Sequence, residues 1–400
     1  MHDLEVIVVG GGIAGAALAV RLSSLGARVT VLERETRFRD RVRGELLYPW
    51  GVVEARLLGV ADALAPVSRE LRHWTTKIQP LHAWRSDLTR SATAAGPAIT
   101  FVHAEAQESL IQAAAAAGAE VVRGAAVRGV EPGTRPAVSL GRAAGQRGAR
   151  LEADLVVGAD GRGSVTARAA GFQSHARAET LVLAGAMFTG AEAPDDTGHV
   201  FMRPDAGLLG LVVPLPGGRH RAYAGYHTAT GRRNLSGPPA LPAFREVMAG
   251  AGMPARWLDD AVLAGPLAEF SGAECWTEPA GDGVALIGDA SAVSDPSWGC
   301  GLALALRDAR VLAEALAGSS DLAAALRRYA HEHAAYHDAL RRQTTWLETV
   351  FRTPGPQADA VRRVALPKIA IDPSRAPDVL GAGPEGASDE GARRRFFGED

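Results

Sequence analysis

Three glycines between a buried strand and a helix constrain the fold of this chain more than any other feature. The run LEVIVVG (residues 4–10) is continuously apolar and β-branched, which is typical of a strand buried on both faces. Residues 13–26, IAGAALAVRLSSLG, have helical spacing, and residues 27–33, ARVTVLE, have the pattern of a second strand. We therefore predict a β-α-β unit with parallel strands and a right-handed crossover.

The glycines at this strand–helix junction have the spacing of a dinucleotide-binding motif. Gly10 permits a tight turn, Gly12 lets a pyrophosphate approach the backbone, and Gly15 lets the helix pack on the sheet. The unpaired N–H groups at the start of the helix favour phosphate, and Glu33 at the end of the second strand can accept hydrogen bonds from ribose hydroxyls. The motif predicts a dinucleotide without distinguishing NAD from FAD, and a tight turn without a ligand is the structural alternative.

Two later acidic turns narrow the choice. DLVVGADGRGS places Asp160 at the end of one apolar run, and ALIGDASAVSDPSWGCG places Asp289 at the end of another. Each alone is an ordinary turn, but the three motifs in this order resemble the flavoprotein monooxygenase family typified by para-hydroxybenzoate hydroxylase, over roughly residues 5–320. The resemblance implies FAD, with Asp289 bonded to its ribityl chain and Asp160 near the pyrophosphate and near NADPH.

The resemblance also implies further contacts with the flavin and the adenine. Arg43 would lie near the flavin as a predicted catalytic residue, His103 would touch it, and the backbone at Val127 would meet the adenine. A solvated basic run around Arg43 and a plain histidine at a helix start are the structural interpretations of the same residues. The predicted cofactor-binding residues are Gly10, Gly12, Ile13, Ala14, Gly15, Glu33, Arg34, Arg43, His103, Val127, Asp160, Asp289, Gly299, Gly301 and Leu302.

The stretch SDPSWGCG precedes a long apolar helix that begins near Gly301. This stretch resembles the family's Pro-x-x-Gly-x-Gly segment, so the helix would present N–H donors to the flavin, and side chains at 299 or 301 would collide with the ring edge. Pro296 would leave an unpaired carbonyl at the active site, and Trp298 would stand beside the ring as a lid or platform; both are predicted catalytic residues. The alternative is a core tryptophan in a turn. A tyrosine or arginine filling the space beside Gly299 would contradict this interpretation.

The pattern of the chain changes between about residues 176 and 275, where short strand-like runs are divided by Gly/Pro turns, as in an antiparallel sheet. We predict an α/β fold in which a Rossmann-like FAD-binding domain, split in sequence, holds an inserted, mainly antiparallel β-sheet substrate domain and is followed by C-terminal helices. The predicted boundaries are 1–75, 99–175 and 276–352 for the FAD-binding domain, 76–98 and 176–275 for the substrate domain, and 353–400 for a partly flexible C-terminal extension that includes a flexible surface segment at 383–395.

Composition limits the partners and the compartment. The formal net charge is −2, which gives no basic excess and excludes nucleic acid and anionic membranes as first choices of partner. Cys275 and Cys300 form neither a disulfide framework nor a metal motif, which indicates a reducing compartment. No signal peptide is recognised and no stretch reaches the roughly 20 apolar residues of a membrane span. The sequence predicts a cytoplasmic protein with a small-molecule substrate.

By resemblance, the expected function is an FAD-dependent monooxygenase that hydroxylates or epoxidises an aromatic or polycyclic molecule through a flavin C4a-hydroperoxide, with NADPH or NADH as reductant. Ala167 stands where the family often has an arginine, and Arg168 follows, so a separate flavin reductase is an alternative source of reduced flavin. Lys77 raises the alternative of a halogenase, although no Trp-x-Trp signature occurs. The same scaffold would also suit a flavin dehydrogenase or reductase, or a non-catalytic flavin-binding or drug-sequestering protein.

No sequence motif marks the substrate pocket, so its residues are predicted from their type and their place in the chain. Aromatic residues predicted within reach of a flat substrate are Trp74, Trp84, Tyr223 and Tyr226. No motif for a general base occurs, and the candidates are His73, His82, Tyr226 and His227.

Overall fold

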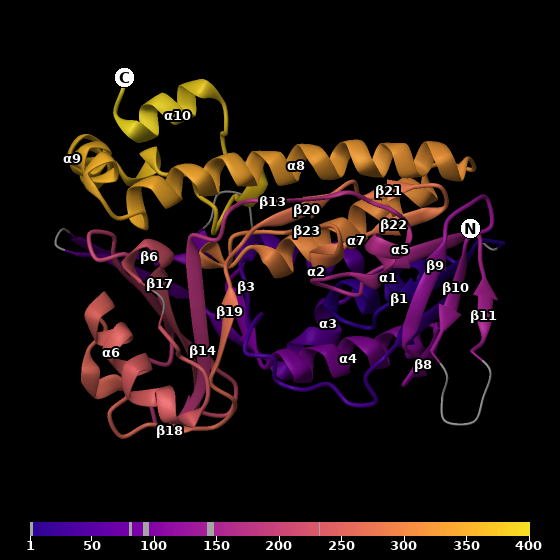
Figure 1. The fold of residues 1–400 in the computed structure, drawn as a ribbon, viewed down its shortest axis with the longest axis horizontal. Helices are drawn as coiled ribbons and strands as arrows, with labels where there is room; N and C mark the ends of the chain where they lie inside the picture. Colours follow the sequence, from indigo (N-terminus) through magenta and orange to yellow (C-terminus); the bar gives the residue numbers. More distant parts are fainter. Residues whose placement is uncertain (1–2, 80–81, 91–95, 142–147, 232) are drawn as a thin grey trace.

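Two β-sheets, one mainly parallel and one mainly antiparallel, lie side by side beneath one long helix (Figure 1). The computed structural model describes residues 3–79, 82–90, 96–141, 148–231 and 233–400. The helices are α1 (Ile13–Ser24), α2 (Pro49–Leu58), α3 (Ala61–Leu64), α4 (His103–Ala116), α5 (Val165–Ala169), α6 (Leu241–Ala251), α7 (Gly301–Ala317), α8 (Leu322–Phe351), α9 (Pro356–Ile371) and α10 (Glu390–Phe397). The strands are β1 (Glu5–Val9), β2 (Arg28–Glu33), β3 (Leu46–Leu47), β4 (Ser68–Leu71), β5 (His73–Ile78), β6 (His82–Asp87), β7 (Ala98–Phe101), β8 (Glu120–Arg123), β9 (Val127–Glu131), β10 (Ala137–Leu140), β11 (Arg150–Glu152), β12 (Leu155–Gly158), β13 (Ser174–Ala176), β14 (Leu181–Thr189), β15 (Thr197–Arg203), β16 (Leu208–Leu215), β17 (Arg219–His227), β18 (Val262–Leu263), β19 (Ala268–Ser271), β20 (Cys275–Thr277), β21 (Ala280–Gly281), β22 (Val284–Leu286) and β23 (Ala292–Val293).

The first sheet has the strand order β21-β22-β12-β1-β2-β8 and is parallel except for β21. Its central register pairs Val8 with Val157 on one side and with Val31 on the other, and all three are fully buried. They are buried because helices α1, α4 and α7 cover one face and the β9–β10–β11 sheet covers the other. The strands come from three separate parts of the sequence, so the predicted split of this unit is confirmed.

The second sheet has the order β18-β14-β17-β16-β15-β5-β6, with β19 paired to β14, and only β15 and β5 run parallel. One face packs against α6 through an apolar cluster that includes Phe188 and Phe244. The other face belongs to the main core, which also contains residues of β1, α1 and α7. The predicted α/β fold with an inserted, mainly antiparallel sheet is therefore confirmed.

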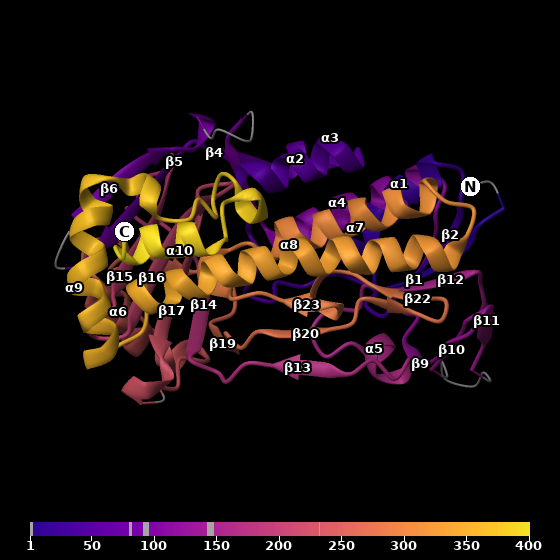
Figure 2. The ribbon, with the colours of Figure 1, turned by 90° about the horizontal axis from the view of Figure 1, so that it is seen from above.

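Helix α8 runs along both sheets, and the C-terminal segment folds back on its end (Figure 2). Most of the segment 383–395 lies at the surface, as expected, and its flexibility stays a prediction, but it also makes specific contacts with the rest of the protein. Glu385 forms an ion pair with Arg307, and the Gln343 side chain donates to the Gly386 carbonyl at 2.8 Å. Phe396 of α10 is fully buried. The polar composition concealed these contacts because their partners lie far away in the sequence.

In the described part of the chain, no helix combines the length and apolarity needed to cross a membrane. Cys275 and Cys300 are both free thiols. Cys300 is buried, and burial raises its pKa well above the usual value.

Candidate functional site

A continuous cavity of about 690 Å³ runs from the carboxyl ends of the parallel strands to the inner face of the antiparallel sheet. We call the part formed by residues 10–14, 160–163 and 288–289 the turn end, and the part formed by Leu183, Leu209, Leu211, Val213, Tyr223 and Phe270 the sheet end. Predicted site residues that line the cavity are Gly10, Gly12, Ile13, Ala14, Glu33, Arg34, Arg43, His103, Val127, Asp160, Asp289, Pro296, Gly299, Gly301 and Leu302. Gly15 and Trp298 are not among the lining residues.

The turn from β1 into α1 depends on close backbone contact. Gly10 has φ +105°, and a Cβ there would lie 2.5 Å from the Ala159 carbonyl oxygen. A Cβ on Gly15 would lie 2.0 Å from the Gly10 carbonyl oxygen. Gly15 is therefore needed for close packing of α1 against the turn, although it does not line the cavity. No side chain caps α1, whose first residue follows Gly12, so its first N–H groups and the positive end of its dipole face the cavity.

Glu33 joins the second strand to this turn. Its side chain is buried, and its two carboxylate oxygens accept hydrogen bonds from the Gly11 N–H at 2.7 Å and the Glu35 N–H at 2.8 Å. Each oxygen retains a lone pair, so the carboxylate is held in place and can still accept further bonds.

The turn after β12 is organised by Asp160. One carboxylate oxygen accepts from the Ser164 hydroxyl at 2.5 Å, and the other accepts from the N–H groups of Val165 at 2.7 Å and Thr166 at 3.0 Å. Asp160 therefore binds the first two N–H groups of the short helix α5, whose N-cap residue is Ser164, and fixes the backbone of residues 160–163 along the cavity.

The turn after β22 exposes the Asp289 carboxyl to the cavity. Burial raises its pKa, and the positive charges of Arg43 and Arg162 oppose that shift. In the described part of the chain, no hydrogen bond is made to this carboxyl. Among the described residues, Asp289 is therefore an acceptor without a protein donor, and the positive charges of Arg43 and Arg162 favour its ionised form.

The same turn is fixed from behind by Asp308 of α7. Its buried carboxylate accepts the Gly288 N–H at 2.7 Å, the Tyr336 hydroxyl at 2.6 Å and a contact from His337 Nε2 at 3.2 Å. The ligand atoms of Asp308, His333 and His337 lie within 4.8 Å of one another. The centroids of the two imidazole rings lie 4.0 Å apart with their planes tilted by 30°, and each ring bonds to a neighbouring oxygen, so this group is a closed hydrogen-bonded cluster.

His103 begins α4 beside Gly44. Its Nδ1 lies 2.8 Å from the Gly44 carbonyl, which can only accept, so Nδ1 carries the proton. Burial lowers the pKa of His103, so the ring is neutral at pH 7. His103 is thus a neutral group on the cavity wall, next to Arg43.

The turn before α7 differs in two respects from the sequence expectation. Trp298 does not stand in the cavity; its side chain is only 7% exposed and joins the main core. The Pro296 carbonyl is not unpaired, because it accepts the Gly299 N–H at 3.2 Å. These differences arise because residues 296–298 form a 3-10 turn, which directs the indole inward and uses the carbonyl for its own closure.

Gly299 is required for a different reason from the one predicted. It has φ +64°, and a Cβ would lie 3.1 Å from the ring of Tyr48, whereas the nearest atom to a Cβ on Gly301 is Ser294 Oγ at 3.7 Å. Tyr48 lies behind Gly299 and is not a lining residue, so it does not fill the cavity there. No side chain caps α7, and Gly301 and Leu302 bring its N-terminus to the cavity wall.

The sheet end is apolar except for one buried polar group. The Tyr223 hydroxyl donates to a Glu45 carboxylate oxygen, and both residues line the cavity. Arg221, which has no exposed surface, contacts Glu45 at 3.0 Å and Asp40 at 2.8 Å. Burial raises the pKa of Glu45 against the charge of Arg221, and burial also raises the pKa of Tyr223 well above 10.0.

Of the aromatic and basic candidates at the sheet end, only Tyr223 lines the cavity. Trp74 is buried behind the wall, and the Tyr226 hydroxyl faces the opposite side of the sheet, where it donates to the Arg233 carbonyl. His73, Trp84 and His227 are not lining residues, and the side chain of His82 lies outside the described residues.

Sequence reasoning missed the sheet-end wall and the Glu45 group. The alternation of Leu209, Leu211 and Val213 along β16 is the signal that would have found one wall. Glu45 directly follows the RVRG segment that contains Arg43, but no local pattern marks Arg221 as its partner.

Comparison with curated proteins gives short matches. Squalene epoxidase of Schizosaccharomyces pombe is 39% identical over 78 residues, covering 20% of this chain and 16% of its own. Squalene monooxygenase of Mus musculus is 48% identical over 62 residues, covering 16% of this chain and 11% of its own. The matched segment is thus a small part of these relatives' length.

Solved structures match over most of the chain. A flavin-dependent brominase has a TM-score of 0.74 at 16% identity, with 86% of each chain covered. The anhydrotetracycline hydroxylase OxyS from Streptomyces rimosus has a TM-score of 0.72 at 21% identity, covering 99% of this chain and 76% of its own. Aklavinone-11 hydroxylase, solved with FAD and aklavinone, has a TM-score of 0.71 at 20% identity, covering 87% and 69%. These identities establish a shared fold.

A sequence profile of the family described as FAD binding domain matches residues 3–344. This match spans the three glycine and aspartate turns and the whole sheet end. The resemblance predicted from the motifs is confirmed: the chain belongs to the FAD-binding domain family of flavoprotein monooxygenase type.

Proposed function

We propose that this protein is an FAD-dependent monooxygenase that transfers one oxygen atom from O₂ to an aromatic or polycyclic small molecule, with NADPH or NADH as reductant. The observation that carries the proposal is the single cavity, which joins dinucleotide-binding turns at one end to an apolar pocket with one polar group at the other. A flat organic molecule bound at the sheet end would lie in the same cavity as the cofactor.

The residues of the turn end suit FAD. The open N-terminus of α1 faces the cavity at Gly12, where a Cβ would meet only Gln107 Nε2 at 3.6 Å, so a diphosphate has room beside the backbone. Glu33 has lone pairs left for ribose hydroxyls, and the unbonded Asp289 carboxyl is an acceptor for a polyol chain. We propose that these groups hold FAD, together with the backbone at Val127, which would contact the adenine.

The chain's own contribution to the chemistry is electrostatic and steric. FAD, when bound, supplies the redox chemistry that activates O₂. The N-terminus of α7 and the Arg43 side chain favour negative charge on the group beside them. The leucine and valine side chains of the sheet end exclude water from the reacting groups.

The Tyr223–Glu45 pair gives the sheet end its one polar anchor. Because the tyrosine hydroxyl already donates to Glu45, its oxygen is left to accept a hydrogen bond from a substrate hydroxyl. Arg221 holds the Glu45 carboxylate in place from behind. A proton that leaves the substrate at this point would have Glu45 as its acceptor, through Tyr223.

We propose two alternative sources of electrons for the flavin, NAD(P)H itself and a separate flavin reductase. Arg168, which follows the position where the family often has an arginine, donates to the Gly163 carbonyl at 2.6 Å, and Ala167 is buried. Neither residue lines the cavity. Direct reduction by NAD(P)H and delivery of reduced flavin by a separate reductase are therefore both to be tested.

The halogenase alternative has the shared fold with a brominase in its favour, but no residue of the described cavity supports it. The chain has two lysines, Lys77 and Lys368, and neither lines the cavity. Lys77 and Trp74 are three positions apart on β5, so their side chains lie on opposite faces of the strand. The Trp74 side chain belongs to the core beside the cavity, and Lys77 therefore points away from it.

The test is to purify the protein, record its flavin spectrum, and follow NADH and NADPH oxidation with a panel of phenolic and polycyclic compounds, with and without bromide and with and without an added flavin reductase. Product that carries one oxygen atom from ¹⁸O₂ supports the proposal. Brominated product would establish a halogenase, and dehydrogenated product without ¹⁸O a dehydrogenase. A bound flavin without turnover in any arm would establish a flavin-binding or sequestering protein.

A further inference from the structure

The turn before α7 is held from behind by a single charged contact. Ser294, Pro296, Ser297 and Gly299 line the cavity, whereas the Asp295 carboxylate is buried away from it. One Asp295 oxygen accepts the Ser297 N–H at 2.8 Å, which closes the turn, and the other accepts from Arg352 at 2.8 Å. Among the described residues, Arg352 is the one ion-pair partner of Asp295.

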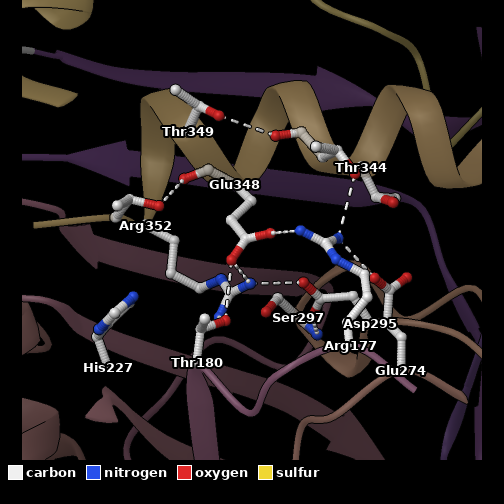
Figure 3. A network of polar contacts seen from close by, with 12 residues as sticks. Arg177, Thr180, His227, Glu274, Asp295, Ser297, Thr344, Glu348, Thr349 and Arg352 are labelled. Atoms are coloured by element: carbon white, nitrogen blue, oxygen red, sulfur yellow. Dashed lines mark hydrogen bonds and ion pairs between the residues drawn. The ribbon is translucent and has the colours of Figure 1, made fainter. Parts of the chain in front are cut away.

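Arg352 is itself fixed by a network at the end of α8 (Figure 3). Glu348, one helical turn earlier, contacts Arg352 at 2.8 Å and Arg177 at 3.2 Å. The Thr180 hydroxyl donates to Glu348 at 2.9 Å, and Arg177 pairs with Glu274 at 2.7 Å. Three carboxylates thus share two guanidinium groups in a largely buried cluster.

The members of this network sit where the chain passes between the two sheets. Arg177 and Thr180 lie between β13 and β14, and Glu274 lies between β19 and β20. The last turns of α8 therefore join both crossings to the turn that lines the cavity. The crossing at Glu274 is also joined to this part of the chain by the pairing of β20 with β23, whereas the end of α8 has Arg352 and Asp295 as its charged link to the turn.

We propose that Arg352 is a positioning residue that acts through Asp295 to hold the turn of residues 295–299, and with it the N-terminus of α7, against the cavity. The claim about the flavin rests on the proposed function, whereas the claim about the turn does not. Arg352 touches neither the cavity nor any group assigned to the cofactor. Its effect on bound flavin is therefore indirect.

The test compares Arg352→Gln with Arg177→Gln, which removes the same charge from the same network without touching Asp295. Hydrogen–deuterium exchange of the purified protein is followed by mass spectrometry over residues 294–301. We expect faster exchange in Arg352→Gln and wild-type exchange of this segment in Arg177→Gln. Asp295→Asn, which keeps an acceptor for the Ser297 N–H, is expected to repeat the effect of Arg352→Gln, and Arg352→Lys is expected to restore slow exchange.

A second readout is the affinity for FAD, measured by quenching of flavin fluorescence. Arg352→Gln is expected to weaken FAD binding about tenfold, with Arg177→Gln within about twofold of wild type. Equal changes of exchange and affinity in both variants would overturn the proposal in favour of a general loss of stability, as would a failure of Arg352→Lys to rescue. If wild type binds no FAD, the proposed function fails, while the exchange experiment still decides whether Arg352 holds the turn.

Discussion

The turn end and the sheet end of the cavity are built from different parts of the chain. The turn end is made of backbone that leaves parallel strands, as at Gly10 and Gly288, and Glu33, Asp160 and Asp308 accept hydrogen bonds from backbone N–H groups there. The sheet end is made of side chains that project from one face of an antiparallel sheet, such as Leu209 and Leu211. A change that displaces backbone at the turn end therefore alters the fold, whereas a change at the sheet end alters mainly the shape of the pocket.

This difference accounts for the spread of functions among the structures with the same fold. They include a brominase and hydroxylases, at 16–21% identity. A site made of backbone is expected to be reproduced together with the fold. A site made of side chains can be rebuilt by substitution without cost to the sheet, so a shared fold does not carry the substrate with it.

The largest expected effect is that of Gly15→Ala. The new Cβ would lie 2.0 Å from a backbone oxygen that cannot move without breaking the β1–α1 turn. We expect a loss of about 3 kcal/mol in the free energy of unfolding, measured in urea without FAD, and loss of flavin binding. Gly12→Ala is the matched control, because its Cβ meets only Gln107 at 3.6 Å; its unfolding should change by less than about 1 kcal/mol. Equal stability losses would contradict this account of the turn.

The turn end could be predicted from sequence because its requirements are local. Glycine spacing after an apolar run specifies the approach of backbone to a ligand, and an acid at the end of the next strand specifies its partner. Even so, the bonds from the start of α5 to Asp160 and the role of Gly299 in avoiding Tyr48 depend on tertiary contacts that no local pattern shows. Trp298 was misplaced because aromatic character alone does not tell which side of a turn a residue faces.

Glu45→Gln tests the buried charge at the boundary of the two ends. Arg221 has no exposed surface and would keep only Asp40 as a charged partner, so we expect a loss of about 2 kcal/mol in the free energy of unfolding. Glu35→Gln is the control, because its ion pair with Arg41 is partly exposed to water and should contribute about 0.5 kcal/mol or less. Urea unfolding of both variants at pH 7 measures the difference, and similar losses would show that burial adds nothing to the Glu45 pair.

The sheet end could not be predicted because its groups are joined by tertiary contacts. Tyr223 was one of several aromatic candidates, and nothing near it in the sequence distinguished it from Tyr226. The two residues differ because three positions along a strand reverse the face, which sends Tyr226 toward α6. The face that lines the cavity was fixed only by the docking of the two sheets.

A pH series compares histidines that lie behind each end. Burial lowers the pKa of His333, behind the turn end, to about 3, and that of His199, behind the sheet end, to about 4. Both stay neutral in the folded protein while the unfolded chain takes up protons below about pH 6.5. Stability should therefore be complete above pH 6.5 and fall as the pH drops toward 4 and then 3, by at most about 1.4 kcal/mol per pH unit for each histidine.

The variant His199→Phe should flatten this slope between pH 6.5 and about 4, because a phenylalanine cannot bind a proton and suits the contact with Trp257. The flavin affinity of this variant should keep its wild-type pH dependence, since His199 lies behind the other end. Urea unfolding at a series of pH values measures the slope. An unchanged slope would show that His199 is not protonated preferentially on unfolding.

The smallest expected effect on stability is that of Leu211→Ala. Its half-buried side chain faces the cavity, so truncation enlarges the pocket instead of creating an enclosed void, and should lower the free energy of unfolding by about 1 kcal/mol or less. Leu215→Ala, on the same face of β16 but fully buried, should cost about 3 kcal/mol. Leu211→Ala should change the KM for bulky substrates severalfold at an unchanged Kd for FAD. A matching fall in FAD affinity would show that the two ends are not separable, because it would make a sheet side chain part of the cofactor site.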